Sequence, residues 1–203
     1  MDYIQGFIMG IAYVAPIGLQ NLFVINTALT QKRSRAYITA LIVIFFDITL
    51  ALACFFGIGK IMELHPMLEN IILGVGSVVV IYIGIMVFKD RKTDLAHKDD
   101  LNIPILKVIT TACVVTWFNP QAIIDGTMML GAFNASLSPA AGKLFILGVA
   151  TASIAWFLGL STILTIFKKK FTPTVLKYIN IVCGSIILFY GFKLFLNLLV
   201  NVL

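Results

Sequence analysis

The sequence carries little charge. Only 12% of its 203 residues are charged, whereas 60% are hydrophobic. A soluble domain carries about a quarter charged residues, and one of this length cannot hide so much apolar surface from water. Lipid must therefore act as the solvent for most of the chain, and the predicted class is an all-α polytopic membrane protein.

The chain also lacks the side chains and motifs on which catalytic and metal sites are built. Its two histidines lie in polar gaps, its three cysteines have no CxxC spacing, and no HExxH, GxSxG, Walker or GxGxxG pattern is present. The sequence therefore predicts no cofactor and no resident metal, and it favours a protein that is not an enzyme. The net charge of +6 comes from basic residues in short loops, which indicates lipid headgroups rather than nucleic acid as their partner.

Six apolar stretches approach or exceed the length of about 20 residues that a membrane span needs. They cover residues 3–29, 37–61, 71–88, 105–133, 144–167 and 176–202. With short connections they fill the chain, so residues 1–203 are predicted to form a single transmembrane transporter domain. The N-terminus has no basic segment before the first stretch, which is therefore predicted to be a permanent span rather than a signal peptide.

The basic residues predict the orientation of the chain. Of the 15 lysines and arginines, 12 lie in or beside the first, third and fifth gaps between the apolar stretches. Cytoplasmic loops carry an excess of such residues, so these gaps are expected in the cytoplasm and both termini outside. The longest gap, residues 89–104, is predicted to be a charged cytoplasmic loop.

The two halves of the sequence share a pattern. Pro16 is followed five residues later by Asn21, and Pro120 is followed five residues later by Asp125. A Gly-Ser pair followed by a tyrosine also recurs in the same order later in each half. The pattern predicts a duplication, with repeat 1 at about residues 1–90 and repeat 2 at about residues 105–203. Each repeat would hold three spans, an odd number, so the repeats are expected to be inverted relative to each other.

Two carboxylates are predicted to lie inside the membrane. Asp47 is in the middle of the second apolar stretch and Asp125 near the middle of the fourth. An ionised carboxylate at this depth costs about 2.5–3.5 kcal/mol on insertion scales. No basic residue lies at a comparable depth in the sequence, so a cationic substrate, a transported proton or both would supply the missing charge. A neutral structural role for either acid is the alternative.

The two prolines are expected to break the first and fourth helices, because proline lacks an N–H and clashes with the preceding turn. A half-helix would begin at Pro16 and at Pro120, with Asn119 as the N-cap of the second. Gly18 would let a ligand approach the backbone, and Gln121 would share a helix face with the acid four residues later. The alternative is that the prolines only kink packed helices.

The motifs APIGLQN in the first stretch and WFNPQAIIDG in the fourth, with an aspartate in the second, resemble the lysine exporter (LysE) family. The match is strongest to its lysine/arginine-exporting branch and extends over essentially the whole chain. The resemblance implies a secondary-active exporter of basic amino acids in the bacterial cytoplasmic membrane, driven by the proton motive force. The family's motif residues correspond here to Pro16, Gly18, Gln20, Asn21, Asp47, Asn119, Pro120 and Asp125.

One position departs from the family pattern. The lysine-type motif reads P-x-G-P-Q-N, and Leu19 replaces its second proline. The Gln-Asn pair after it is kept, which separates this branch from the neutral amino-acid exporters with their PGP motif.

Two carboxylates and two half-helix N-termini suit a ligand that is both cationic and anionic, such as a basic amino acid. The predicted substrate-binding residues are Asp47, Asp125, Asn21, Gln20, Gly18, Asn119 and Gln121. The open alternatives are an exporter of neutral amino acids, an exporter of divalent metals with Cys54 and Cys113 as donors, and an intramembrane aspartyl hydrolase. Protons and a second copy of the chain are the further expected partners.

Overall fold

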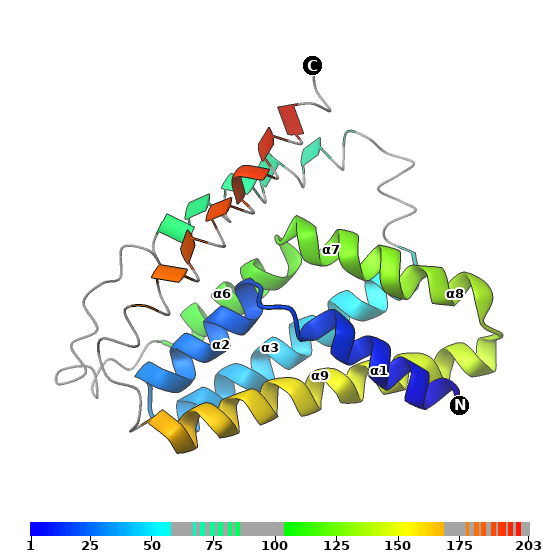
Figure 1. The fold of residues 1–203 in the computed structure, drawn as a ribbon, viewed down its shortest axis with the longest axis horizontal. Helices are drawn as coiled ribbons and strands as arrows, with labels where there is room; N and C mark the ends of the chain where they lie inside the picture. The colour runs from blue at the N-terminus through cyan, green and yellow to red at the C-terminus, as the bar shows by residue number, and fades with distance from the viewer. Residues whose placement is uncertain are drawn as a thin grey trace.

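The computed structural model describes residues 1–57 and 104–168 continuously, with scattered residues between 67 and 85 and between 178 and 199. Within these residues every regular element is a helix (Figure 1). The elements are α1 (Asp2–Val14), α2 (Leu19–Thr30), α3 (Arg33–Phe55), α6 (Ile105–Trp117), α7 (Pro120–Gly126), the π-helix η1 (Thr127–Gly131), α8 (Ala132–Ser136) and α9 (Pro139–Phe167).

The lengths of these helices match the prediction of a membrane protein. Among the described residues, α3 and α9 are each long and apolar enough to cross a membrane, and α1 with α2 passes the same test as one broken span. The predicted spans at 71–88 and 176–202 fall largely outside the described residues, so the number six stays a prediction.

The first helix is broken, as predicted, but the second half does not begin at Pro16. α1 ends at Val14, α2 begins at Leu19, and the two axes differ in direction by 76°. Gly18 is the N-cap, in an extended conformation with φ −119°. The half-helix starts late because the Asn21 side chain donates to the carbonyl oxygens of Val14 and Pro16, which holds the intervening chain open.

Leu19 occupies the first helical position of α2, where the family motif has a proline. Proline suits this position because the N–H it lacks would be unpaired there in any helix. Leucine starts the helix at the same place, so this break does not need the second proline.

The second break follows the prediction more closely. α6 ends at Trp117, and α7 begins at Pro120, with Asn119 in the N-cap position. The predicted side-chain cap is wrong, however, because Asn119 makes no capping hydrogen bond. From Pro120 the chain stays helical through η1 to the end of α8.

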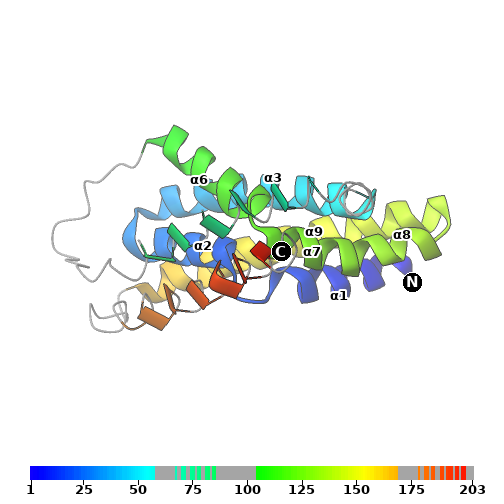
Figure 2. The same ribbon diagram turned by 90° about the horizontal axis from the view of Figure 1, so that it is seen from above.

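The broken helices run in opposite directions. α1 and α2 run the same way as α9, whereas α3 and the segment from α6 to α8 run the opposite way (Figures 1 and 2). α2 packs on α3, α6 and α9, so the start of α2 lies where several helices meet.

Glycines allow α1 to lie directly against α9. A Cβ added at Gly6 or Gly10 would overlap the backbone of α9, and one at Gly148 would overlap the backbone of α1 at Tyr3 and Phe7. Helices in lipid associate through small residues that let backbones approach, and these three glycines act in this way.

The close contact between α1 and α9 predicts how the protein responds to one added methyl group. Gly148→Ala should lower the melting temperature of the purified protein, because overpacking a close contact costs about 1–3 kcal/mol. The matched control is Gly159→Ala on the same helix, where an added Cβ meets no described atom within 4 Å. Equal melting temperatures for the two variants, measured in the same detergent, would contradict the close packing.

Candidate functional site

Asp47 lies near the middle of α3 and has no exposed surface. Its Oδ1 accepts a hydrogen bond from Gln20 Nε2 at 3.1 Å, and its Oδ2 accepts one from Ser153 Oγ at 2.5 Å. Both donors are neutral, and they come from α2 and α9. Each carboxylate oxygen therefore has a partner, although neither partner supplies a positive charge.

Gln20 extends this contact to a fourth helix. Its Nε2 also donates to Thr116 Oγ1 at 3.0 Å, near the end of α6. Thr116 is fully buried, like Ser153. We call Gln20, Asp47, Thr116 and Ser153 the Asp47 cluster. It connects α2, α3, α6 and α9 at the level of both helix breaks.

Asn21 holds the first break in place. Its Nδ2 donates to Val14 O at 2.9 Å and to Pro16 O at 2.7 Å, and its Oδ1 accepts from Trp156 Nε1 at 2.8 Å. Both amide hydrogens are used on carbonyls that the end of α1 leaves open. The geometry gives Asn21 a positioning role, and its predicted contact with substrate stays a prediction.

Gly18 is the N-cap of α2 and precedes Gln20 of the Asp47 cluster by two residues. Among the described residues, a Cβ added there would meet only the Pro16 carbonyl oxygen, at 4.0 Å. Protein packing therefore does not require a glycine here, unlike at Gly148. Within the described part of the chain no side chain caps α2, so its first amides lie uncapped at the positive end of the helix dipole.

The residues predicted on the fourth span lie on α7. Asp125 is half-buried there, and Pro120 opens the helix. The side chain of Gln121 falls outside the described ones. The Tyr13 hydroxyl, near the end of α1, donates to Ala122 O on α7 at 3.3 Å.

Cys54 and the glycines of this region let the fourth span approach α3. A Cβ at Gly126 would meet the Cys54 sulfur at 2.8 Å, and one at Gly131 would meet the Cys54 carbonyl oxygen at 3.2 Å. Cys54 is fully buried, and its thiol lies 3.7 Å from Ile123 O. Cys54 therefore packs in the contact between α3 and the segment of α7 and η1.

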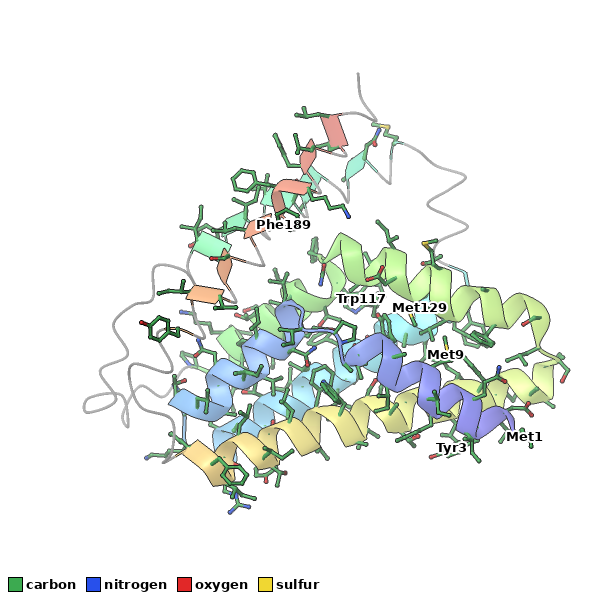
Figure 3. All side chains as sticks on the ribbon, in the orientation of Figure 1. Met1, Tyr3, Met9, Trp117, Met129 and Phe189 are labelled. Carbon is green, nitrogen blue, oxygen red and sulfur yellow. The ribbon has the colours of Figure 1, made fainter. Side chains whose placement is uncertain are left out.

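Three residues of the site are not predicted from the sequence: Tyr13, Thr116 and Ser153. The duplication could have indicated Ser153. The first residues of α3 and α9, Arg33 and Pro139, are 106 residues apart, and Ser153 follows Asp47 by the same offset. Tyr13 and Trp117 each lie in the last turn of the helix before a break, α1 and α6 (Trp117 is labelled in Figure 3). Trp117 Nε1 donates to Thr49 Oγ1 at 3.2 Å, so its indole bonds to α3.

The arrangement provides a desolvated carboxylate beside an uncapped helix start. A buried carboxylate attracts an ammonium or guanidinium group strongly, because little water screens the charge. An uncapped helix start attracts a carboxylate. The two features together fit a ligand that carries both groups.

Comparison with known proteins finds relatives among arginine exporters. The chain is 30% identical over 196 residues to the arginine exporter protein ArgO of Klebsiella pneumoniae strain 342. The proteins of the same name from Shigella flexneri and Escherichia coli O157:H7 are also 30% identical over 196 residues. In each case the match covers 95% of this chain and 92% of the relative.

No solved structure matches this chain. The family model described as "LysE type translocator" matches residues 11–198, which is nearly the whole sequence. The chain therefore belongs to the LysE type translocator family of membrane proteins.

Proposed function

We propose that this chain exports basic amino acids, arginine and lysine, across the bacterial cytoplasmic membrane as a secondary-active transporter. The observation that carries the proposal is the complete burial of Asp47 among neutral donors. A carboxylate at this depth gains most from a ligand that brings a positive charge. The names of the relatives, arginine exporters, support the same substrate class.

Recognition would divide between the two ends of the amino acid. The side-chain cation would bind at Asp47, with Asp125 as the second acid. The α-carboxylate would bind the first amides of α2 beside Gly18, where no described side chain lies within 4 Å of an added Cβ. Gln20 connects the two parts, because it is both the second residue of α2 and a hydrogen-bond donor to Asp47. Asn119 and Gln121 would contribute from the second break.

The proposed fold is a six-helix bundle of two inverted repeats within residues 1–203. The opposite directions of α3 and α9 support it, as do the opposite directions of the two broken helices (Figure 1). A further contact agrees, since Leu198 lies 3.4 Å from a Cβ added at Gly74, and these residues belong to the last predicted span of each repeat.

Three further parts of the proposal concern orientation, energy and assembly. The bias of the basic residues supports both termini outside, with residues 89–104 in the cytoplasm. Coupling to the proton motive force would follow if a proton replaces the substrate cation at an acid inside the membrane. Assembly into a homodimer is also proposed. The dependence of export on the pH gradient tests the coupling to protons, and cross-linking in native membranes tests the homodimer.

Reconstituted protein tests the substrate. We expect arginine and lysine to exchange across proteoliposomes, with neutral amino acids such as leucine and a divalent cation such as Cd²⁺ failing to compete. Competition by leucine would indicate the neutral-exporter alternative, and competition by Cd²⁺ would indicate the metal alternative. Absence of any exchange, together with cleavage of a peptide substrate, would indicate the hydrolase.

Asp47→Asn should separate charge from structure. The Ser153 hydroxyl can rotate to accept from the new amide, so the hydrogen-bonded cluster survives and the melting temperature stays within a few degrees. A charge-assisted contact is worth about 1.5–3 kcal/mol, so KM for arginine should rise about 10- to 100-fold.

The control for this change is Asp2→Asn, which makes the same substitution at the first residue of α1. It should leave both KM and stability unchanged. Asp125→Asn should resemble Asp47→Asn. Wild-type KM in Asp47→Asn would show that this carboxylate does not recognise the cation.

Gly18→Ala should impair substrate binding without harming the fold. The added methyl group has room, and φ of −119° suits alanine. It would nevertheless occupy the space in which the α-carboxylate approaches α2, and we expect KM to rise about tenfold. Gly159→Ala, which adds a methyl group in equally open space on α9, is the matched control. Unchanged KM in both variants would contradict carboxylate binding at this helix start.

A further inference from the structure

Polar and apolar residues alternate at helical spacing on the facing sides of α3 and α9. On α3, Asp47 is preceded four residues earlier by Val43 and eight residues earlier by Thr39. On α9, Ser153 is followed four residues later by Phe157 and eight residues later by Ser161. Steps of four and eight residues keep a side chain near the same face of a helix.

Two contacts show that these residues lie at matching depths. The helices run in opposite directions, and Asp47 bonds Ser153 while Tyr37, ten residues earlier, bonds Thr162 at 3.0 Å. Thr39 and Ser161 therefore both lie about 12 Å from the Asp47 cluster, at a rise of about 1.5 Å per residue. They lie on the side of the cluster towards the end of α9, where Lys168 Nζ donates to Gln31 O at 3.0 Å.

The hydroxyl groups of Thr39 and Ser161 are fully buried and have no hydrogen-bond partner within the described part of the chain. Hydroxyls in mid-helix ordinarily donate to the carbonyl four residues earlier, as Thr27, Thr162 and Thr165 do here. Thr39 and Ser161 do not. A buried hydroxyl without a partner costs about 1–3 kcal/mol of folding stability. Packing alone therefore does not explain a hydroxyl at either position.

An apolar layer separates these hydroxyls from the Asp47 cluster. Val43 and Phe157 have no exposed surface, and Val24 of α2 has 1%. The three side chains belong to one apolar cluster that joins α2, α3 and α9. Val24 follows Gln20 by four residues, so α2 also carries a polar residue in the Asp47 cluster and an apolar residue one turn away from it.

We propose that Thr39 and Ser161 form a second polar station on the substrate route, between the Asp47 cluster and the end of the bundle at Gln31 and Lys168. Val24, Val43 and Phe157 form the gate between the two positions, which is closed in this structure. The proposal rests on the proposed transport function. When α2 moves away from α3 and α9, the two hydroxyls would contact the passing ammonium or guanidinium group, or the water that accompanies it.

Removal of the hydroxyls should slow transport without weakening binding. In the double variant Thr39→Val and Ser161→Ala we expect Vmax for arginine to fall about tenfold, with KM within twofold of wild type. The melting temperature should stay equal or rise, because unpartnered hydroxyls are removed. Thr39→Ser keeps the hydroxyl and should keep wild-type Vmax.

The matched controls are Thr110→Val on α6 and Ser185→Ala, because both hydroxyls are exposed and donate to carbonyls of their own helices. They should leave Vmax unchanged. A double variant with wild-type Vmax would overturn the proposal, as would a loss of Vmax in Thr39→Ser equal to that in Thr39→Val.

Accessibility gives a second test that does not depend on the identity of the substrate. Thr39→Cys should react with a small charged thiol reagent, applied to inside-out and right-side-out vesicles, faster than the parent protein does. Ala40→Cys is the control, because Ala40 is the next residue on α3 and is equally buried. Equal, slow labelling of both variants would overturn the polar station. Failure of the wild type to carry arginine or lysine would instead refute the proposed substrate.

Discussion

A fully buried carboxylate in a chain that lies in lipid is the constraint on which the described structure depends. Asp47 cannot take hydrogen bonds from its own helix, because the N–H groups of α3 are already used within the helix. Its donors must come from neighbouring helices at the same depth. Gln20 and Ser153 meet this requirement only if α2 starts, and α9 passes, beside the middle of α3.

The break in the first span follows from this requirement. A continuous helix over residues 2–30 would carry Gln20 along the axis of α1, which is held directly against α9 by Gly6, Gly10 and Gly148. The 76° bend turns α2 instead onto α3, α6 and α9. Proline removes a helical hydrogen bond, and Asn21 then satisfies the carbonyls that the break exposes. The same bend creates the uncapped helix start beside Gly18.

Much of the fold and part of the site were readable from residue type and spacing. Low charge and long apolar stretches predict the membrane class, and Pro120 marks the second break to the residue. The predicted start of the half-helix at Pro16 is three residues too early, because the side chain that determines the observed start, Asn21, acts across the break. Ser153 and Thr116 were missed for a similar reason, since an isolated hydroxyl in an apolar stretch has many structural uses.

The sequence alone determined that the chain lies in lipid, that it holds acids at mid-span, and that its first and fourth helices are interrupted. These properties are local, since they depend on the hydrophobicity of a stretch and on the missing N–H of proline. Only the tertiary structure decided which neutral groups satisfy Asp47, which glycines bring helices together, and which hydroxyls are left without partners. Those depend on the depth and direction at which distant helices pack, and sequence spacing within one helix does not contain that information.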